Sequence, residues 1–304
     1  MDTPWRDPAW LAEAHAWIEG RTGHLGLTRA GEIEQPHVYP WSTVLRVPTT
    51  RGDLWFKANS AELRHEASLV TLVAERVPER VPPLLASDLE RGWMLMPDAG
   101  QRLREVIAVE RNLHRWLDVL EATAEIQLAM EPDVDALLAA GVPDMRLATL
   151  PDRYAQLMDT LQAEARFRAA HAQVVELCEE LAAFGVTETL QHDDLHDGQV
   201  FLRNGTHLIM DWGDACISHP FFTLSVALEG AIAWGVDDVE SSEDIEPYRR
   251  AYLAPYAKRY DVDLVSASTV AMRLGWVCRA VNGYVPGDDD HTLIRLRMFV
   301  DGRP

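Results

Sequence analysis

The sequence is short of cysteine, of lysine and of long apolar runs, and each shortage excludes a class of protein. Cys178, Cys216 and Cys278 are widely spaced with no paired pattern, so we expect reduced thiols in the cytoplasm rather than a disulfide framework. No uninterrupted apolar run is long enough to span a bilayer. The opening residues also lack the basic and apolar regions of a secretory signal, so none is expected.

Positive charge is scarce as well. The chain has 28 Lys and Arg residues against 48 Asp and Glu residues, a formal net charge of −20. Nucleic acids and anionic membranes both need a positive face, so we expect neither as a partner. The charge is compatible with a small cationic substrate, and equally with a generally acidic surface. Lys57 and Lys258 are the only lysines, so the ammonium group within the apolar run 54–58 stands out.

The length of 304 residues exceeds one ordinary core and suggests two lobes. The first part of the chain predicts a small antiparallel β-sheet with two helices. An amphipathic helix is expected over 8–20, and short β-rich runs follow from Glu32 to Asn59. Among these, 42–47 and 54–58 form a predicted hairpin, Ser60 is expected to cap a helix ending near Val77, and further strands are expected at 84–86 and 93–96.

Composition changes at the breaker cluster Pro97-Asp98-Ala99-Gly100. Beyond it, nearly everything from Leu103 to Gly185 reads as helix, and further helices are expected at 219–234, 245–259, 266–282 and 291–300. An acidic loop at 237–244 separates two of them. We therefore predict an α+β fold of two lobes, a β lobe with a lead-in helix over residues 1–97 and a larger helical lobe over residues 98–304.

One stretch of the helical lobe departs from this pattern. From Gln191 to Arg203 a polar loop crowded with carboxylates leads into an apolar strand, and Asn204-Gly205 then separates it from a second apolar run. Asn-Gly between apolar runs is the strongest short hairpin signal, because a type I′ turn needs positive φ at both central positions. We expect the hairpin to return Asp211 to the neighbourhood of Asp194 and Gln199. Two carboxylates and an amide oxygen suit a hard divalent cation such as magnesium, beside a proton acceptor.

These residue types match what phosphoryl transfer requires. The protein must position a nucleotide and an acceptor and neutralise phosphate charge, with little covalent work of its own. Lys57 lies on the third predicted strand, and Glu62 and Glu66 lie at i and i+4 on one face of the next helix. Either glutamate can hold the lysine. The carboxylates of the hairpin stretch follow in the order along the chain that the chemistry needs.

At this point the sequence resembles the aminoglycoside phosphotransferase and choline kinase family, which has the protein-kinase-like fold. The resemblance covers about residues 30 to 230. The motifs that carry it are Phe56-Lys57, Glu66, His192-x-Asp194-x-His196-x-x-Gln199 and Asp211-Trp212.

By that resemblance the enzyme uses ATP and Mg²⁺, and the β lobe binds the nucleotide. Asp194 would be the catalytic base, Asp211 the principal magnesium ligand and Gln199 a second ligand in place of the family's Asn. Lys57 would bind the α- and β-phosphates and pair with Glu66. The segment 93–100 would be the hinge that binds adenine, with Met94 and Met96 contributing backbone atoms.

Three positions depart from the family pattern. Gln199 carries one more methylene than the expected Asn, which leaves support for a second metal open. No Gly-rich loop precedes the strand of Lys57, so backbone amides of 37–43 and the Ser42 hydroxyl would have to contact the phosphates. Asp193 stands where the family usually has Gly, and we rank it below Asp194 as a base. His192 is expected to bond the loop backbone.

The leading hypothesis is an ATP-dependent small-molecule kinase, with an amine-bearing alcohol or sugar as the favoured acceptor and antibiotic resistance as one physiological role that fits. Two alternatives stay open. His192, Asp194 and His196 would lie on one face of a strand and ligate a transition metal in a metal-dependent hydrolase. A nucleotide-binding pseudokinase is motivated by Gln199. Neither the acceptor nor the oligomeric state can be read from the sequence.

Overall fold

The computed structural model describes residues 4–230 and 244–302. The chain divides into two compact units. The first unit consists of Met1–Gln101 and Phe201–Gly213, and the second consists of Arg102–Val200 and Asp214–Pro304. This division differs from the expected ranges 1–97 and 98–304 because the return strand of the hairpin packs within the first unit.

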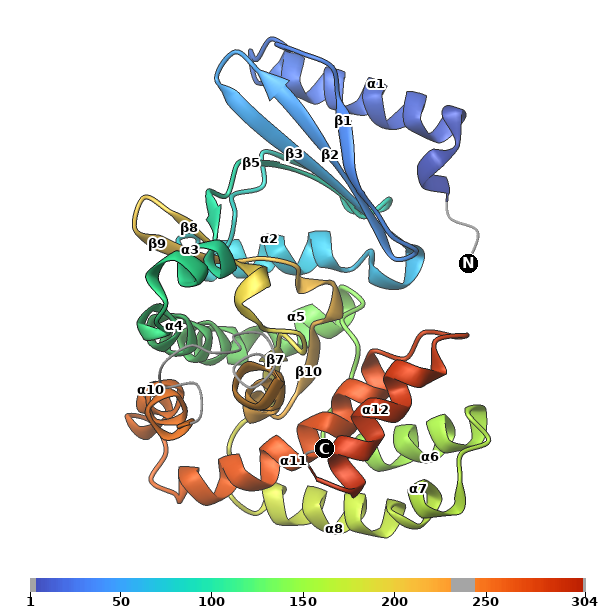
Figure 1. Cartoon of the computed structure of the whole chain (residues 1–304), viewed down its shortest axis with the longest axis vertical. Coiled ribbons are helices and arrows are strands. Elements are labelled where there is room, and N and C mark those ends of the chain that lie inside the picture. Colours follow the sequence, from blue (N-terminus) through green and yellow to red (C-terminus); the bar gives the residue numbers. More distant parts are fainter. Residues whose placement is uncertain (1–3, 231–243, 303–304) are drawn as a thin grey trace. The chain divides into compact units, whose positions relative to one another are not determined.

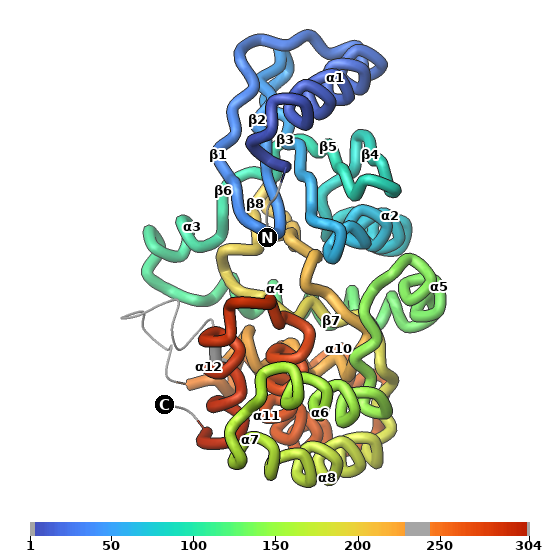
Figure 2. Tube along the Cα trace, turned by 90° about the vertical axis from the view of Figure 1, so that its right-hand side faces the viewer, coloured from blue at the N-terminus to red at the C-terminus, as the bar shows by residue number. Residues whose placement is uncertain are grey.

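The first unit is built on a five-stranded antiparallel sheet of order β1-β2-β3-β5-β4. Figure 1 labels β1, β2, β3 and β5, and Figure 2 also labels β4. The hairpin of this sheet was predicted from the alternating β-branched runs and is confirmed, since β2 and β3 pair along their whole length. The strands are β1 (Glu34–Val38), β2 (Ser42–Thr49), β3 (Gly52–Asn59), β4 (Ala86–Asp88) and β5 (Trp93–Pro97).

The lead-in helix α1 (Pro8–His24) supplies the core of this unit. Asp7 caps it by accepting from the backbone N–H groups of Ala9 and Trp10, and Pro8 occupies the first helical position. Its buried Ala14 and Ile18 belong to the same apolar cluster as alternate side chains of the sheet. Those strand members of the cluster are Leu45, Val47, Leu54, Phe56, Ala58, Trp93 and Leu95. Because side chains alternate along a strand, the opposite face of the sheet carries Lys57.

The expected helix after Ser60 begins later than the sequence predicted. A 3₁₀ turn, η2 (Ala61–Leu63), comes first, and α2 runs over Glu66–Arg76. Ser60 precedes η2 but its side chain makes no capping hydrogen bond. The side-chain amide of Asn59 donates to the carbonyl of Leu63 at 3.2 Å, next to this break. The late start places Glu66 in the first turn of α2.

A second small sheet contains the predicted hairpin. Its strands are ordered β6 (Gln101–Arg102), β8 (Val200–Arg203) and β9 (Thr206–Ile209). Asn204 and Gly205 have φ of 53° and 83°, the positive values that the type I′ turn requires. Gly100 has φ of 91°, and a Cβ atom at that position would lie 2.2 Å from the carbonyl oxygen of Leu202. Only glycine therefore allows the chain to pass β8 so closely.

The second unit is mostly helical, as predicted. Its helices are α3 (Leu103–Glu110), α4 (His114–Met130), α5 (Val134–Ala139), α6 (Leu150–Thr160), α7 (Ala165–Ala169), α8 (His171–Ala182), α10 (Glu246–Ala257), α11 (Leu264–Asn282) and α12 (Asp289–Val300). Contacts of α11 with α6, α8 and α12 hold one end of the unit together (Figure 2). Two short strands, β7 (Thr189–Gln191) and β10 (Cys216–Ser218), pair antiparallel.

The expected helix over 219–234 is helical in its described part, but it is not a regular α-helix. A 3₁₀ turn, η6 (Pro220–Phe222), is followed by a π-helical turn, η7 (Ser225–Gly230). The Ser225 hydroxyl donates to the carbonyl of Met272 at 2.6 Å, so packing against α11 sets the local geometry. Residues 231–234, and the acidic loop 237–244 apart from Asp244, lie outside the described residues.

One described helix, α11, is long and apolar enough by composition to cross a membrane, although two arginines and several Ser and Thr residues interrupt its apolar residues. In that apolar window 67% of the helix is buried within the protein, which is typical of a core helix. It also carries the buried Arg279 near its carboxyl end. The helix is therefore part of the core of the second unit.

Candidate functional site

In the first unit, β3, α2 and the residues that follow β9 bring together a lysine and two carboxylates. The Lys57 Nζ lies 2.7 Å from Oε2 of Glu66 and 2.5 Å from Oδ1 of Asp211. The ion pair with Glu66 that the resemblance implied is present. Glu62, the other candidate, lies in η2 before α2 begins.

Glu66 is the most heavily bonded member of this cluster. Its side chain is buried, and it accepts hydrogen bonds from Lys57, from the Asn59 side-chain amide at 2.5 Å and from the backbone N–H of Trp212 at 3.0 Å. Burial opposes the positive charge of Lys57, but the carboxylates of Asp211 and Glu66 outweigh burial and hold the pKa of Lys57 above its ordinary value. Lys57 is therefore a fixed ammonium group at neutral pH.

Asp211 differs from Glu66 in its exposure and its backbone. Its side chain is 50% exposed, and its φ of 62° is positive. A non-glycine residue in the left-handed region costs free energy, which the surrounding contacts must offset. The carboxylate is thus held beside Lys57 while half of its surface faces solvent, as a ligand-binding group requires.

The strand register places the other nucleotide candidates on the same face of the sheet as Lys57. Lys57 pairs directly with Val44 on β2 and with Met94 on β5, and Met96 lies two residues further along β5. Ser42 is also on this face, but it is 4% exposed and its Oγ lies 3.4 Å from His37 Nε2. Met94 and Met96 are buried too, so a ligand would meet their backbone rather than their side chains.

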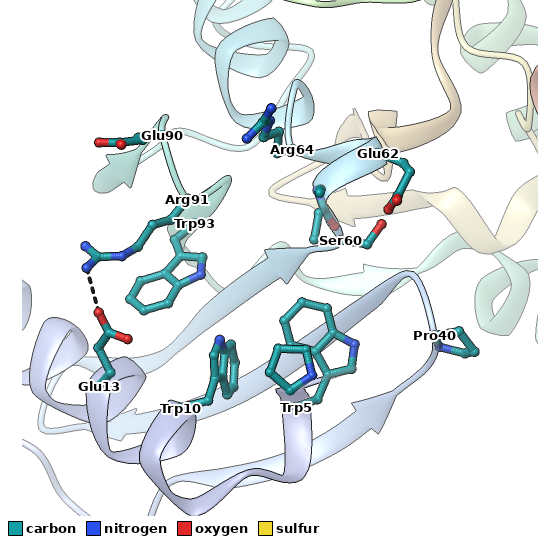
Figure 3. A pocket seen from close by; sticks show the side chains of 13 residues that line it. Trp5, Trp10, Glu13, Pro40, Ser60, Glu62, Arg64, Glu90, Arg91 and Trp93 are labelled. Atoms are coloured by element: carbon teal, nitrogen blue, oxygen red, sulfur yellow. Dashed lines mark hydrogen bonds and ion pairs between the residues drawn. The ribbon is translucent and has the colours of Figure 1, made fainter. Parts of the chain in front are cut away.

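A pocket of about 540 Å³ lies elsewhere in the first unit (Figure 3). Trp5, Trp10 and Trp93 line it, together with the ion pair between Arg91 and Glu13. Neither Lys57 nor Asp211 is among its lining residues. This pocket is therefore distinct from the lysine–carboxylate cluster.

In the second unit, the candidate base follows the short strand β7. A buried hydrogen-bond network around Gln127 of α4 fixes that strand and its surroundings. The Thr189 hydroxyl donates to the Gln127 carbonyl, and the Gln127 side chain bonds both the Pro220 carbonyl and the hydroxyl of Tyr252. The loop after β7 thus starts from a rigid anchor.

Within that loop, Asp194 is the partly exposed carboxylate, and its neighbours hold the backbone. Its side chain is 27% exposed. His192 is buried, and its Nδ1 lies 3.4 Å from the backbone nitrogen of Asp194. The predicted bond of His192 to the loop backbone is therefore present. His196 Nδ1 accepts from the Gly198 N–H at 3.0 Å, which caps the 3₁₀ turn η4 (Asp197–Gln199). Arg104 pairs with the buried Asp197 at 2.6 Å.

Asp193 is buried, unlike Asp194, and points to different partners. Its φ of 63° explains why glycine suits this position in the family. Its carboxylate accepts from Gln191 at 3.0 Å and from Asn282 of α11 at 2.9 Å. Burial raises the pKa of Asp193 to about 6, although Arg279 and the two amides act in the opposite direction.

Sequence reasoning missed Arg279, the cation that serves this loop. Its guanidinium lies 2.7 Å from Asp194, 2.9 Å from Asp214 and 3.5 Å from Asp193. Burial opposes its charge, but the three carboxylates hold the pKa of Arg279 well above its ordinary value. No local motif marks this residue, because its role depends on how α11 packs.

The donor set expected for magnesium consists of oxygen atoms. Asp211 offers a half-exposed carboxylate in the first unit, and Gln199 offers a half-buried amide at the end of η4 in the second. Carboxylate and amide oxygens suit Mg²⁺ better than zinc, so the residues fit the group chemically. Because the two residues belong to different units, their convergence with Asp194 remains a prediction.

The metal-dependent hydrolase finds no support in the described residues. The strand β7 ends at Gln191, so His192, Asp194 and His196 do not alternate along a strand. Within 4–230 and 244–302, no group of three or more His, Cys, Asp or Glu residues is arranged to hold a metal ion.

Comparison with known proteins identifies the class. The model of the phosphotransferase enzyme family matches residues 40–262, most of the chain, so the chain belongs to that family. It is accordingly a phosphotransferase that acts on a hydroxyl group, a small-molecule kinase by class. A search of curated protein sequences finds no match.

Solved structures agree on the protein-kinase-like fold. Choline kinase LicA from Streptococcus pneumoniae is similar with a TM-score of 0.63 at 14% identity, covering 95% of this chain and 98% of that one. An ethanolamine kinase from Plasmodium vivax has a TM-score of 0.61 at 11% identity, covering 93% and 87%. A GDP complex of a type IIIa aminoglycoside 2′-phosphotransferase variant has a TM-score of 0.60 at 16% identity, covering 94% and 96%.

Proposed function

We propose that the protein is an ATP-dependent kinase that transfers the γ-phosphoryl group to a hydroxyl of a small acceptor, with amine-bearing alcohols and sugars favoured. The observation that carries the proposal is the Lys57–Glu66–Asp211 cluster, in which one fixed ammonium is held by a buried and a half-exposed carboxylate. A lysine held by a glutamate on an adjacent helix is the arrangement that protein kinases use to bind nucleotide phosphates.

Each unit supplies different groups to the reaction. In the first unit, Lys57 contacts the α- and β-phosphates, Glu66 positions Lys57, and the backbone at Met94 and Met96 receives adenine. In the second unit, Asp194 accepts the proton of the acceptor hydroxyl while the oxygen of that hydroxyl forms a bond to the γ-phosphorus. The bond from that phosphorus to the bridging oxygen breaks, and ADP leaves.

Magnesium would be held by Asp211 and Gln199 and would neutralise phosphate charge. Lys57 already pairs with Asp211 at 2.5 Å, so the lysine keeps this carboxylate in place. Ser42 is a weaker candidate for a phosphate contact, because its hydroxyl is buried beside His37.

The acceptor class rests on charge and on relatives. The net charge of −20 is compatible with a cationic molecule, and the similar structures are those of a choline kinase, an ethanolamine kinase and an aminoglycoside phosphotransferase. All three cysteines are free and buried, which is consistent with our proposal of a reducing, cytoplasmic location.

The test is a nucleotide-consumption screen. Purified protein is incubated with Mg-ATP, or with Mg-GTP, and a panel of amino sugars, amino alcohols, sugars and peptide antibiotics, and ADP or GDP release is measured. We expect release that depends on an amine-bearing acceptor. Nucleotide binding without acceptor-dependent release across the whole panel would favour the pseudokinase instead.

Two substitutions test the roles in the active protein. Asp194→Asn should reduce turnover by at least about 100-fold and leave ATP binding nearly intact, because only the proton acceptor is lost. Lys57→Ala should weaken ATP binding while the protein remains folded. Lys258→Ala is the matched control, since Lys258 is exposed and is the only other lysine. Ordinary turnover by Asp194→Asn would refute the base assignment.

A further inference from the structure

The carboxyl end of α11 places a buried guanidinium against the base-bearing loop. Arg279 is 7% exposed, and its Nη2 lies 2.7 Å from Oδ1 of Asp194. Its Nη1 lies 2.9 Å from Oδ2 of Asp214 and 3.5 Å from Oδ2 of Asp193. One rigid fork therefore holds three carboxylates that come from two separate stretches of chain.

The neighbouring polar groups leave this task to Arg279. Arg295 of α12 donates to the backbone carbonyls of Arg279 and Gly283, at 3.4 Å and 2.8 Å. Asn282 donates to Asp193 and to the carbonyl of Asp214. Among the described residues, the ion pairs of Asp194 are those with Arg279 and, at 3.9 Å, with His196 Nε2.

The two oxygens of Asp194 are thus in different situations. Oδ1 is bonded to a group that is buried and anchored by two further carboxylates. Oδ2 lies 3.9 Å from His196, beyond hydrogen-bond distance, and the side chain is 27% exposed. A carboxylate held by one oxygen presents the other in a fixed direction, which is the condition for accepting a proton efficiently.

We propose that Arg279 is the positioning residue of the proposed base. It fixes the Asp194 carboxylate through Oδ1 and leaves Oδ2 to receive the acceptor hydroxyl, while Asp193 and Asp214 hold the guanidinium in place. This inference rests on the proposed function for the chemistry, but the orientation of Asp194 is a structural claim of its own.

The first experiment compares Arg279→Gln and Arg279→Lys with the wild-type enzyme, using the best acceptor from the screen. We expect kcat to fall by about 100-fold in Arg279→Gln, because a misplaced catalytic group of this kind costs that much, with KM for ATP changed by less than about twofold. Arg279→Lys should recover only part of kcat, since an ammonium cannot bridge the carboxylates as the planar fork does. Arg273→Gln, on the exposed face of the same helix, should behave as wild type.

A compensated variant separates positioning from folding. Arg279→Gln leaves three carboxylates close together without their cation, so the variant should be destabilised. Adding Asp214→Asn removes one of those charges and should recover thermal stability. If Arg279 positions Asp194, the double variant stays about 100-fold low in kcat. Recovery of kcat together with stability would show a purely structural role and overturn the proposal.

A crystal structure of the double variant gives a readout independent of turnover. We expect the Asp194 carboxylate to turn away from its wild-type orientation. An unchanged carboxylate would overturn the inference even if kcat of the double variant stays low. If the wild type releases no ADP with any acceptor, the proposed function fails, and the orientation of Asp194 in the two structures still decides the role of Arg279.

Discussion

Replacing Glu66 with Gln is the sharpest perturbation of the first unit, because the change is isosteric and removes one charge. Oε1 of Glu66 accepts from Lys57 at 2.9 Å and from the Trp212 N–H, and Oε2 accepts from Lys57 and from Asn59. Whichever way the amide is turned, its NH₂ group faces two donors. Since hydrogen bonds to charged groups contribute about 1.5–3 kcal/mol each, we expect the free energy of unfolding to fall by about 3 kcal/mol.

That estimate is smaller than the cost of removing a buried ion-pair partner outright, which reaches about 5 kcal/mol, because Asp211 continues to pair with Lys57. Equilibrium unfolding in urea, followed by tryptophan fluorescence, measures the change. A double-mutant cycle with Lys57→Met should give a coupling of about 2 kcal/mol. Glu62→Gln, on the exposed side of the preceding turn, should change stability by less than about 0.5 kcal/mol. A Glu66→Gln midpoint equal to that of the control would refute the reasoning.

Two further predictions concern the backbone and pH. Gly100→Ala should lower the free energy of unfolding in urea by more than about 3 kcal/mol, because its Cβ would lie 2.2 Å from a carbonyl oxygen. Gly287→Ala is the control, since Gly287 has a similar φ in open space, and it should lower that free energy by only about 1–2 kcal/mol. Burial lowers the pKa of His219 to about 3, so its stabilising contribution is complete above pH 6.5 and is lost as pH falls toward 3. His219→Asn should keep the hydrogen bond from the Phe221 N–H. The fall in the free energy of unfolding between pH 7 and pH 4.5 should then be about 3 kcal/mol smaller than in the wild type. An unchanged pH dependence would contradict this.

The parts of the fold that the sequence predicted are those that local chemistry determines. The β2–β3 hairpin follows from alternating β-branched residues, and the turn at Asn204-Gly205 follows from its need for positive φ. The pairing of Lys57 with Glu66 followed from the resemblance, supported by the helical spacing of two glutamates. These signals lie within a few residues of the structure they specify.

What the sequence could not predict depends on distant packing. The π-helical turn at Ser225–Gly230 forms where Gly275 of α11 comes close, since a Cβ there would lie 2.0 Å from the Ser225 hydroxyl oxygen. Arg279 approaches Asp194 only because the same helix packs against the loop after β7. The late start of α2 is likewise accompanied by a side-chain hydrogen bond from Asn59 to the Leu63 carbonyl. No pattern of hydrophobicity encodes such contacts.

The first unit is assembled from two separated segments, and this limits how the protein can be divided or recombined. A fragment ending at Gln101 would lack Asp211 and the Trp212 N–H that bonds Glu66, as well as the strand that runs beside Gly100. Such a fragment keeps Lys57 and Glu66 but loses the contacts that Asp211 and Trp212 make with them. A chimaera that borrows this lobe from a relative must therefore exchange the short insert at 201–213 at the same time, and natural recombination faces the same requirement.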